Sequence, residues 1–268
     1  MMRAVAGLLD VPPLGKALEV AWDHTALPIP RRRVVRRYAD GRSMELDLAD
    51  STQRAMFCGA YEPAETAAVA TILRPGSTFI DAGAHVGWFT ILAAGRVGAG
   101  GAVHAVEAFP DNARMLTRNV ARNAAQNVLV HHQAISDQRG SMVVGRQAGS
   151  DSGSVTAGPG ATEAQVEVPT STLDDMDTGD GPVALLKIDV EGLEARVFAA
   201  APRTLRRVGT VMIEINNGAL ARNGSTQDEL LGALAEAGLQ TITELRRPLD
   251  GLRSMLAPTY RNLLVGRC

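Results

Sequence analysis

One stretch of the chain, residues 78–87, constrains the fold more than any other. Its apolar run ends in Asp81, the glycines Gly83 and Gly87 follow, and a second apolar segment begins at Trp88. This order predicts a buried strand, a tight turn and a helix. Glycine lets the turn approach a ligand closely, and the unpaired amides at the start of the helix face the same place. The stretch therefore predicts a ligand site at the end of a strand.

Downstream of this stretch, apolar strand segments alternate with helical segments. Such alternation predicts an α/β fold of Rossmann-like type, with a mostly parallel seven-stranded sheet and helices on both faces. We expect further strands at residues 102–107, 128–134, 183–189, 210–215, 240–244 and 262–265. We expect helices at residues 110–123, 192–201 and 226–237. An edge strand is expected at 141–145, a short strand at 166–169, and a Gly- and Ser-rich loop at 147–164.

The N-terminal part has a different character. Asp40-Gly41 is a strong hairpin signal between segments 34–38 and 43–48, and residues 14–22 have the pattern of an amphipathic helix. Proline suits the first turn of a helix, so we expect one from Pro63 to residue 73. We therefore divide the chain into an N-terminal helix and hairpin extension, residues 1–60, and a cofactor-binding domain, residues 61–268.

The composition narrows the class of protein. With 268 residues, 46% of them apolar, the chain is long enough for a full α/β domain, and its net charge of −2 gives no sign of a nucleic-acid partner. No apolar run reaches the length of a membrane span. Cys58 and Cys268 make neither a metal-binding spacing nor a disulfide framework, which favours a cytoplasmic location. The sequence leaves the oligomeric state open.

Acids at the ends of successive strands indicate the type of ligand, because ligands bind at the carboxyl ends of parallel strands. Glu107 ends the next strand and is expected to accept hydrogen bonds from two ribose hydroxyls, with Phe109 covering an adenine. Asp81, directly before the turn, would repel a pyrophosphate and attract a sulfonium or ammonium group. The third glycine of the dinucleotide pattern is missing. These features favour S-adenosylmethionine over NAD.

A further pair of strand ends carries groups suited to catalysis. Asp189 and Glu214 end adjacent expected strands, and their carboxylates suit orienting a hydroxyl, removing its proton or holding a divalent cation. No dense ligand motif supports a metal, so metal dependence stays open. His85 is an alternative base, because the usual pKa of histidine is near neutrality, or it packs against the cofactor.

Several blocks of the sequence resemble one known family. They are residues 59–62, 79–90, 106–119, 134–137, 171–174 and 186–194. On these blocks the chain resembles the FkbM family of S-adenosylmethionine-dependent methyltransferases, which typically has asparagine at the position of His85. The resemblance implies a Rossmann-like class I methyltransferase fold. It also implies methyl transfer to hydroxyl oxygens, chiefly of sugars and polyketides.

Both arguments together select the candidate residues. We predict that catalysis depends on Asp189, Glu214 and His85. We predict a cofactor site containing Asp81, Gly83, His85, Gly87, Glu107, Phe109, Ser136, Asp137 and Asp189. We expect the acceptor to bind near Tyr61, Glu62, Glu191 and Asn216, and a divalent metal, if one is used, to bind Asp189 and Glu214.

The leading hypothesis is an S-adenosylmethionine-dependent O-methyltransferase acting on a small hydroxylated metabolite, in carbohydrate or secondary metabolite biosynthesis. A saccharide hydroxyl is the first choice of acceptor and a polyketide-type alcohol the second. Two alternatives come from other classes. One is an NAD-dependent oxidoreductase, against which the missing glycine argues, and the other is a catalytically silent cofactor-binding module.

Overall fold

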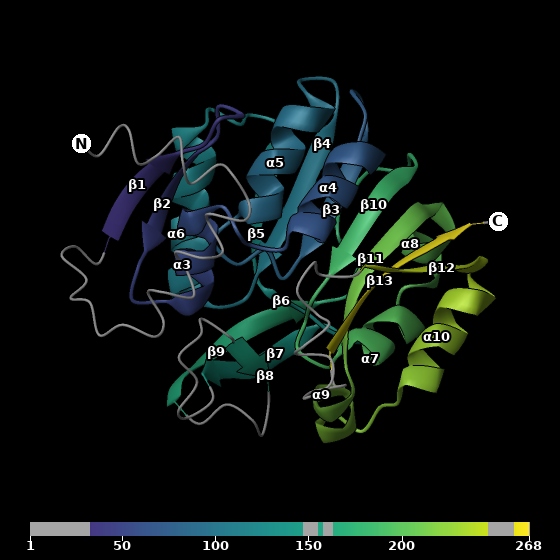
Figure 1. Ribbon diagram of the computed structural model, residues 1–268. Helices are drawn as coiled ribbons and strands as arrows, with labels where there is room; N and C mark the ends of the chain where they lie inside the picture. Colours follow the sequence, from purple (N-terminus) through teal and green to yellow (C-terminus); the bar gives the residue numbers. More distant parts are fainter. Residues whose placement is uncertain (1–32, 147–154, 158–162, 246–259, 268) are drawn as a thin grey trace.

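A seven-stranded sheet forms the centre of the computed structural model, which describes residues 33–146, 155–157, 163–245 and 260–267 (Figure 1). The strands lie in the order β12-β13-β11-β10-β3-β4-β5. Among these described strands, six run in one direction and β13 runs in the opposite direction. The strands are β3 Thr78–Ala82, β4 Ala102–Glu107, β5 Val128–His132, β10 Val183–Ile188, β11 Val208–Asn216, β12 Leu239–Leu245 and β13 Tyr260–Arg267. The predicted mostly parallel sheet is confirmed.

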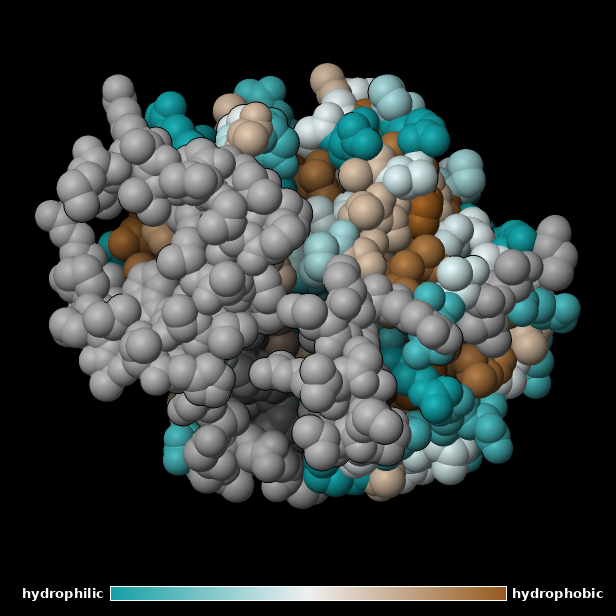
Figure 2. Space-filling model, viewed as in Figure 1, coloured by the Kyte–Doolittle hydropathy of each residue, from teal (hydrophilic) through white to brown (hydrophobic). Residues whose placement is uncertain are grey.

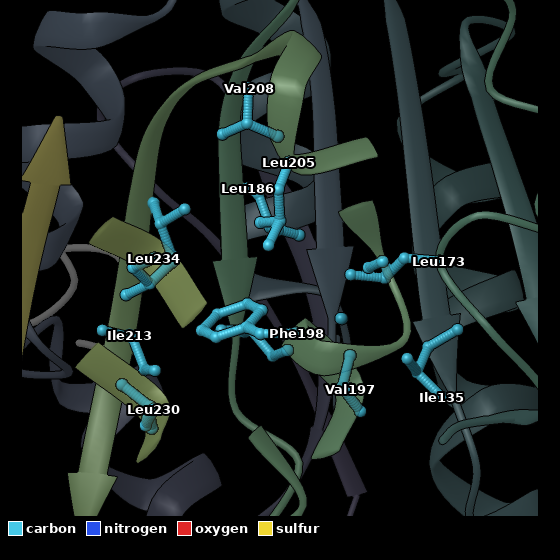
Figure 3. Close-up of a cluster of buried hydrophobic side chains, with 14 of the residues drawn as sticks. Ile135, Leu173, Leu186, Val197, Phe198, Leu205, Val208, Ile213, Leu230 and Leu234 are labelled. Atoms are coloured by element: carbon cyan, nitrogen blue, oxygen red, sulfur yellow. The ribbon is translucent and has the colours of Figure 1, made fainter. Parts of the chain in front are cut away.

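Helices cover both faces of this sheet, because neighbouring strand residues point to opposite sides. On one face Phe79 and Leu185 pack with side chains of helices α4 Pro63–Ile72, α5 Trp88–Val97 and α6 Pro110–Arg122. On the other, Ile80 and Leu186 pack with helices α7 Glu194–Ala199, α8 Pro202–Arg207 and α10 Gln227–Glu236. Figure 3 shows Phe198 of α7 at the centre of this second core.

A second, smaller sheet lies beside the main one and was not anticipated from the sequence (Figure 1). Its order is β6-β9-β7-β8, with strands β6 Ala134–Ile135, β7 Gly140–Arg146, β8 Val155–Ala157 and β9 Glu163–Ser171. Two expectations are therefore wrong: residues 128–134 are not one strand, and the expected loop 147–164 contains β8 and the start of β9. The chain leaves the main sheet at Gln133, whose amide bonds to the carbonyl of His131.

The expected N-terminal hairpin is confirmed as strands β1 Arg33–Arg37 and β2 Ser43–Asp47. It packs against α6, where Asn123 exchanges hydrogen bonds with the backbone of Ser43. Met44 and Leu46 lie in the same buried cluster as Phe79, so the hairpin shares the core of the main sheet. The boundary drawn after residue 60 stays a prediction, and the expected helix 14–22 lies outside the described residues.

Three short helices complete the described structure. Helix α3 Ser51–Cys58 is capped by Asp50, whose carboxylate accepts from the amide of Gln53. Helices α8 and α9 Asn217–Arg222 flank β11. The sequence pattern did not predict α3, α8 or α9. In the space-filling view, hydrophobic side chains of the described region lie in separate patches between hydrophilic ones (Figure 2). Among the described helices, none has the length and apolar character needed to cross a membrane.

Candidate functional site

Two cavities lie at the carboxyl end of the central strands β3, β4 and β10. The larger spans about 480 Å³ and the smaller about 230 Å³, and both volumes include space that is open to solvent. The larger cavity is lined by Gly83, Val106, Glu107, Ala108, Gln133, Ala134, Ile135, Met142, Val144, Asp189, Val190, Glu191 and Leu193. The smaller is lined by Glu62, Glu65, Lys187, Ile188, Asp189, Met212, Ile213, Glu214 and Asn262. Asp189 therefore forms part of both walls.

The turn after β3 packs tightly against the end of β10. Gly83 has a φ of 83°, and a Cβ atom there would lie 2.0 Å from the carbonyl oxygen of Asp189. Any side chain at this position would force the two strand ends apart. Gly87, with a φ of 97°, ends the turn against Leu116 of α6. Glycine at both positions is thus required by the backbone, as the sequence pattern indicated.

Glu107 joins the turn to the wall of the larger cavity. One carboxylate oxygen accepts from the amide of His85 at 2.8 Å, and the other accepts from the amide of Phe109 at 2.9 Å. Burial raises the pKa of this carboxyl to about 7, although these hydrogen bonds lower it. Oε1 also accepts from the side-chain amide of Asn112 at 3.5 Å. Oε2 therefore keeps a lone pair that a hydroxyl donor can use, since a carboxylate has about four acceptor sites.

The small sheet supplies an apolar wall opposite Glu107. Ala134 and Ile135 of β6 and Met142 and Val144 of β7 line the larger cavity. An acid beside an apolar wall fits a nucleoside, whose ribose donates hydrogen bonds while its base packs on apolar atoms. The residues present thus fit S-adenosylmethionine. Sequence reasoning missed this wall, although block 134–137 of the family resemblance marks one of its strands.

Lys187 and Asp189 form an ion pair at the smaller cavity, with 3.5 Å between Nζ and Oδ2. The ammonium also lies 3.4 Å from the carbonyl oxygen of Gly83 and 5.6 Å from the ring centroid of Phe89. Burial lowers the pKa of Lys187, but the nearby carboxylates, with those of Asp189 and Asp81 first, together raise it by more, so the pKa is raised overall. Lys187 therefore stays protonated and holds the Asp189 carboxylate in place.

Asp81 lies deeper than the sequence suggests. Its side chain is fully buried, Oδ2 accepts from the Thr90 hydroxyl at 2.6 Å, and Oδ1 has no hydrogen-bond partner within the described part of the structure. Asp81 is in register with Lys187 on the neighbouring strand. Burial raises the pKa of the Asp81 carboxyl, while the Lys187 ammonium lowers it. It lines neither cavity, and its role in cofactor binding stays a prediction.

His85 occupies the middle of the turn with a φ of 51°, a left-handed conformation that is uncommon for residues other than glycine. Neither ring nitrogen has a hydrogen-bond partner in the described chain, and burial lowers the pKa of the ring. The imidazole is therefore neutral at physiological pH. His85 lies outside the linings of both cavities, so the catalytic and cofactor roles suggested for it remain predictions.

The other predicted site residues fall into two groups. Glu191 lines the larger cavity, and Glu62 and Glu214 line the smaller one. The rest make structural contacts outside both linings: Phe109 packs with Ala134 and Val144, Ser136 donates to Asp137, Asp137 pairs with Arg196, Tyr61 packs on Trp88, and Asn216 caps α9. Glu65 and Asn262 in the smaller cavity were not anticipated.

A metal site is not apparent among the described residues, which contain no group of three or more His, Cys, Asp or Glu side chains arranged to hold an ion. Asp189 and Glu214 do line one cavity together, as the sequence led us to expect. The metal dependence of the protein stays open.

Comparison with known proteins was made on both sequence and structure. No curated protein matches the chain. Among solved structures, it is similar to an S-adenosylmethionine-dependent O-methyltransferase from Thermotoga maritima, with TM-score 0.49 and 16% identity, covering 88% of this chain and 78% of that one. It is also similar to geranyl diphosphate methyltransferase in complex with SAM, with TM-score 0.48 and 17% identity, covering 81% and 90%. A third is TYW2 from M. jannaschii in complex with AdoMet, with TM-score 0.48 and 14% identity, covering 91% and 90%.

The sequence also matches a family model, described as the methyltransferase FkbM domain, over residues 81–240. The matched segment contains the turn after β3, the small sheet and the strand end at Asp189. It spans more than half of the chain. The protein therefore belongs to the FkbM family of methyltransferases, enzymes that use S-adenosylmethionine as methyl donor.

Proposed function

We propose that the protein transfers a methyl group from S-adenosylmethionine to a hydroxyl oxygen of a small metabolite, and that this metabolite is a saccharide. The observation that supports the proposal is the position of Asp189 in the walls of both cavities. A donor in the larger cavity and an acceptor in the smaller one would meet at this residue. Alignment of two reactants accounts for much of the rate of a displacement reaction.

The residues of the chain have separate tasks in this proposal. Bound S-adenosylmethionine supplies an activated methyl group with a good leaving group. Glu107 accepts hydrogen bonds from the ribose, and the apolar wall of the small sheet holds the base. Lys187 pairs with Oδ2 of Asp189. Oδ1 then orients the acceptor hydroxyl and takes its proton as the new bond forms.

The polarity of the smaller cavity supports a saccharide. Its described lining includes the side chains of Glu62, Glu65, Glu214 and Asn262, all with oxygens that accept hydrogen bonds. A sugar presents several hydroxyl donors on a compact ring and can satisfy several acceptors at once. A mainly apolar alcohol would make fewer hydrogen bonds with this lining than a sugar would.

The test uses the purified protein with methyl-labelled S-adenosylmethionine and a panel of sugars and polyketide-type alcohols. We expect label on an oxygen of a sugar, located by mass spectrometry and NMR of the product. Calorimetry with S-adenosylhomocysteine and with NAD, in separate titrations, shows which of the two compounds the protein binds. Label on nitrogen or carbon, or binding of NAD in place of S-adenosylhomocysteine, would contradict the proposal. Label on polyketide-type alcohols alone would refute the saccharide part.

A further inference from the structure

Two histidines outside the described linings of both cavities face each other across strands β4 and β5. His104 is 5% exposed and His131 is half-buried. Nδ1 of His104 lies 3.4 Å from Nε2 of His131, and the two rings stack with their centroids 5.7 Å apart. The residues are diagonal neighbours, because His104 is in register with Leu129 while His131 is in register with Val106. Their side chains therefore join the two strands.

The pair lies next to the wall of the larger cavity. His104 comes two residues before Val106, His131 comes two residues before Gln133, and both Val106 and Gln133 line that cavity. The amide of Gln133 bonds to the carbonyl of His131, and strand β6, which continues the wall, follows at once. Within the described main sheet β5 is an outermost strand and pairs with β4. A contact between β4 and β5 therefore helps to hold this wall in place.

The contact between the two rings depends on their protonation. A neutral imidazole has one N–H donor and one acceptor nitrogen, so the pair keeps its hydrogen bond when both rings are neutral or when one is charged. When both rings are charged, the bond is lost and two like charges face each other.

The surroundings of the pair keep both rings neutral at physiological pH. Burial lowers the pKa of both rings, and His131 lowers the pKa of His104 further. The carboxylate of Asp177, between β9 and β10, raises the pKa of His104, but the pKa remains lowered overall. The rings therefore become charged only in acid.

We propose that the His104–His131 pair is a pH-dependent switch for cofactor affinity. The hydrogen-bonded pair joins β4 to β5 and holds the wall of the larger cavity in the form that binds S-adenosylmethionine. When acid charges both rings, their repulsion loosens β5 and β6, and the affinity for the cofactor falls. The inference concerns the donor site alone and does not depend on which acceptor is methylated.

Calorimetry with S-adenosylhomocysteine at several pH values tests the switch. In His131→Gln the side-chain amide can still bond to His104 but does not titrate, so the pair never holds two charges. From about pH 7.5 to about pH 5.5, we expect the fold-rise in the dissociation constant to be about threefold or more larger in the wild type than in this variant. Glu107 also titrates near the cofactor, but its contribution is common to both proteins.

The matched control is His132→Gln, at the exposed next position of β5, which should follow the wild type. Equal pH dependence in His131→Gln and His132→Gln, both shown by melting curves to be folded, overturns the inference. If His131→Gln does not fold, His104→Asn removes the other titrating ring and takes its place, with the same expected result.

Hydrogen exchange measures the proposed loosening directly. On the same acidification, we expect protection factors of the amides in residues 128–135 to fall about tenfold in the wild type and in His132→Gln, and about threefold or less in His131→Gln. The amides of β10 serve as the internal reference. Equal protection of residues 128–135 in all three proteins at both pH values overturns the role of the pair in holding β5.

The outcomes separate the switch from the proposed function. Normal binding of S-adenosylhomocysteine with the same pH dependence in every variant refutes the switch and leaves methyl transfer intact. Absence of binding at every pH refutes both. Binding that weakens in acid only in the proteins that keep both His104 and His131 supports the switch.

Discussion

Asp189 is held by its backbone and by its side chain in different ways. Its amide donates to the carbonyl of Ala82 at 3.0 Å, and its own carbonyl oxygen lies directly against Gly83. Its carboxylate pairs with Lys187. The main chain is therefore fixed by β3, while the side chain reaches the boundary between the two cavities.

Replacement of Asp189→Asn should separate catalysis from cofactor binding. The amide is close in size to the carboxylate but cannot take a proton, so we expect kcat to fall by roughly 100-fold or more. The affinity for S-adenosylhomocysteine, measured by calorimetry, should stay near the wild-type value. Asp228→Asn, at an exposed position of α10, is the matched control. Turnover unchanged in Asp189→Asn would show that this residue is not the base.

Replacement of Glu107→Gln should act on the donor instead. The glutamine amide has one accepting oxygen, so it loses the bond from His85 or from Phe109 and one acceptor for the ribose. We expect the dissociation constant for S-adenosylhomocysteine to rise about tenfold or more. Glu163→Gln, at an exposed position, serves as the control. If both variants bind S-adenosylhomocysteine with equal affinity, the ribose does not bind to Glu107.

The sequence predicted which acids end the strands, but it did not predict how deeply each of their side chains is buried. Asp81 and Glu107 were expected as a pair, yet Glu107 lines the cavity while Asp81 lies below it against Thr90. The difference arises because Lys187, 106 positions away, is paired in register with Asp81. No local pattern records such a long-range neighbour. Glu65 was missed for the same reason, since its partner Asn262 lies on β13.

At the scale of elements, the turn after β10, which begins just beyond Asp189, has an unusual backbone conformation. Glu191 has a φ of 55° and Gly192 a φ of 97°, and a Cβ atom on Gly192 would lie 2.4 Å from the backbone of Ala219. The buried carboxylate of Glu194 accepts from the amides of Val190 and Gly192 through one oxygen. This acid therefore stabilises the turn from within the protein.

The stability of the protein should respond to Glu194→Gln in a pH-dependent way. Burial raises the pKa of Glu194 from 4.5 to about 7, so the folded protein binds this proton more tightly than the unfolded chain does. The resulting contribution of Glu194 to the free energy of unfolding is fully present below the pKa of the unfolded chain and is lost as the pH rises through about 7. Glutamine keeps the accepting oxygen and does not titrate.

We therefore expect the free energy of unfolding of the variant to rise relative to that of the wild type, by up to about 3 kcal/mol, as the pH increases from about 5 to about 8. Urea unfolding at each pH measures the difference. The pH-dependent contribution of Glu107 cancels in this difference because both proteins contain that residue. A difference that does not vary with pH would contradict the assignment.

Elements with strong local signals were predicted, and those that depend on distant partners were not. Helix α10 carries a full capping box, in which Thr226 and Glu229 satisfy each other, and it was expected from the sequence. Strands β6 and β8 have two and three residues, and they pair with β9 and β7 respectively. So short a segment shows no periodicity, and its pairing is fixed by the rest of the small sheet.

At the scale of the whole molecule, Asn119 connects the N-terminal hairpin to the cofactor turn. Its fully buried side chain accepts from the amide of Glu45 at 2.7 Å and donates to the carbonyls of Glu45 and Val86. Val86 lies in the turn between Gly83 and Gly87. One side chain on α6 thus joins two regions far apart in the sequence.

Loss of this connection should weaken both regions. Asn119→Ala leaves backbone groups of Glu45 and Val86 without partners, so we expect the free energy of unfolding to fall by about 3 kcal/mol. Urea unfolding followed by circular dichroism measures the loss. Gln126→Ala, at an exposed position after α6, should change it little. Equal stability of the two variants would mean that the hairpin is held by its apolar contacts alone.

The close contact between β3 and β10 has a consequence for how the chain is made. Gly83 and Lys187 touch, yet they are 104 positions apart. During synthesis β3 can pair with β4 as soon as that strand appears, but its other edge waits until β10 has left the ribosome. That open edge is apolar and invites pairing with another chain. Slow translation between these strands should therefore lower the yield of native protein, even where the finished fold is stable.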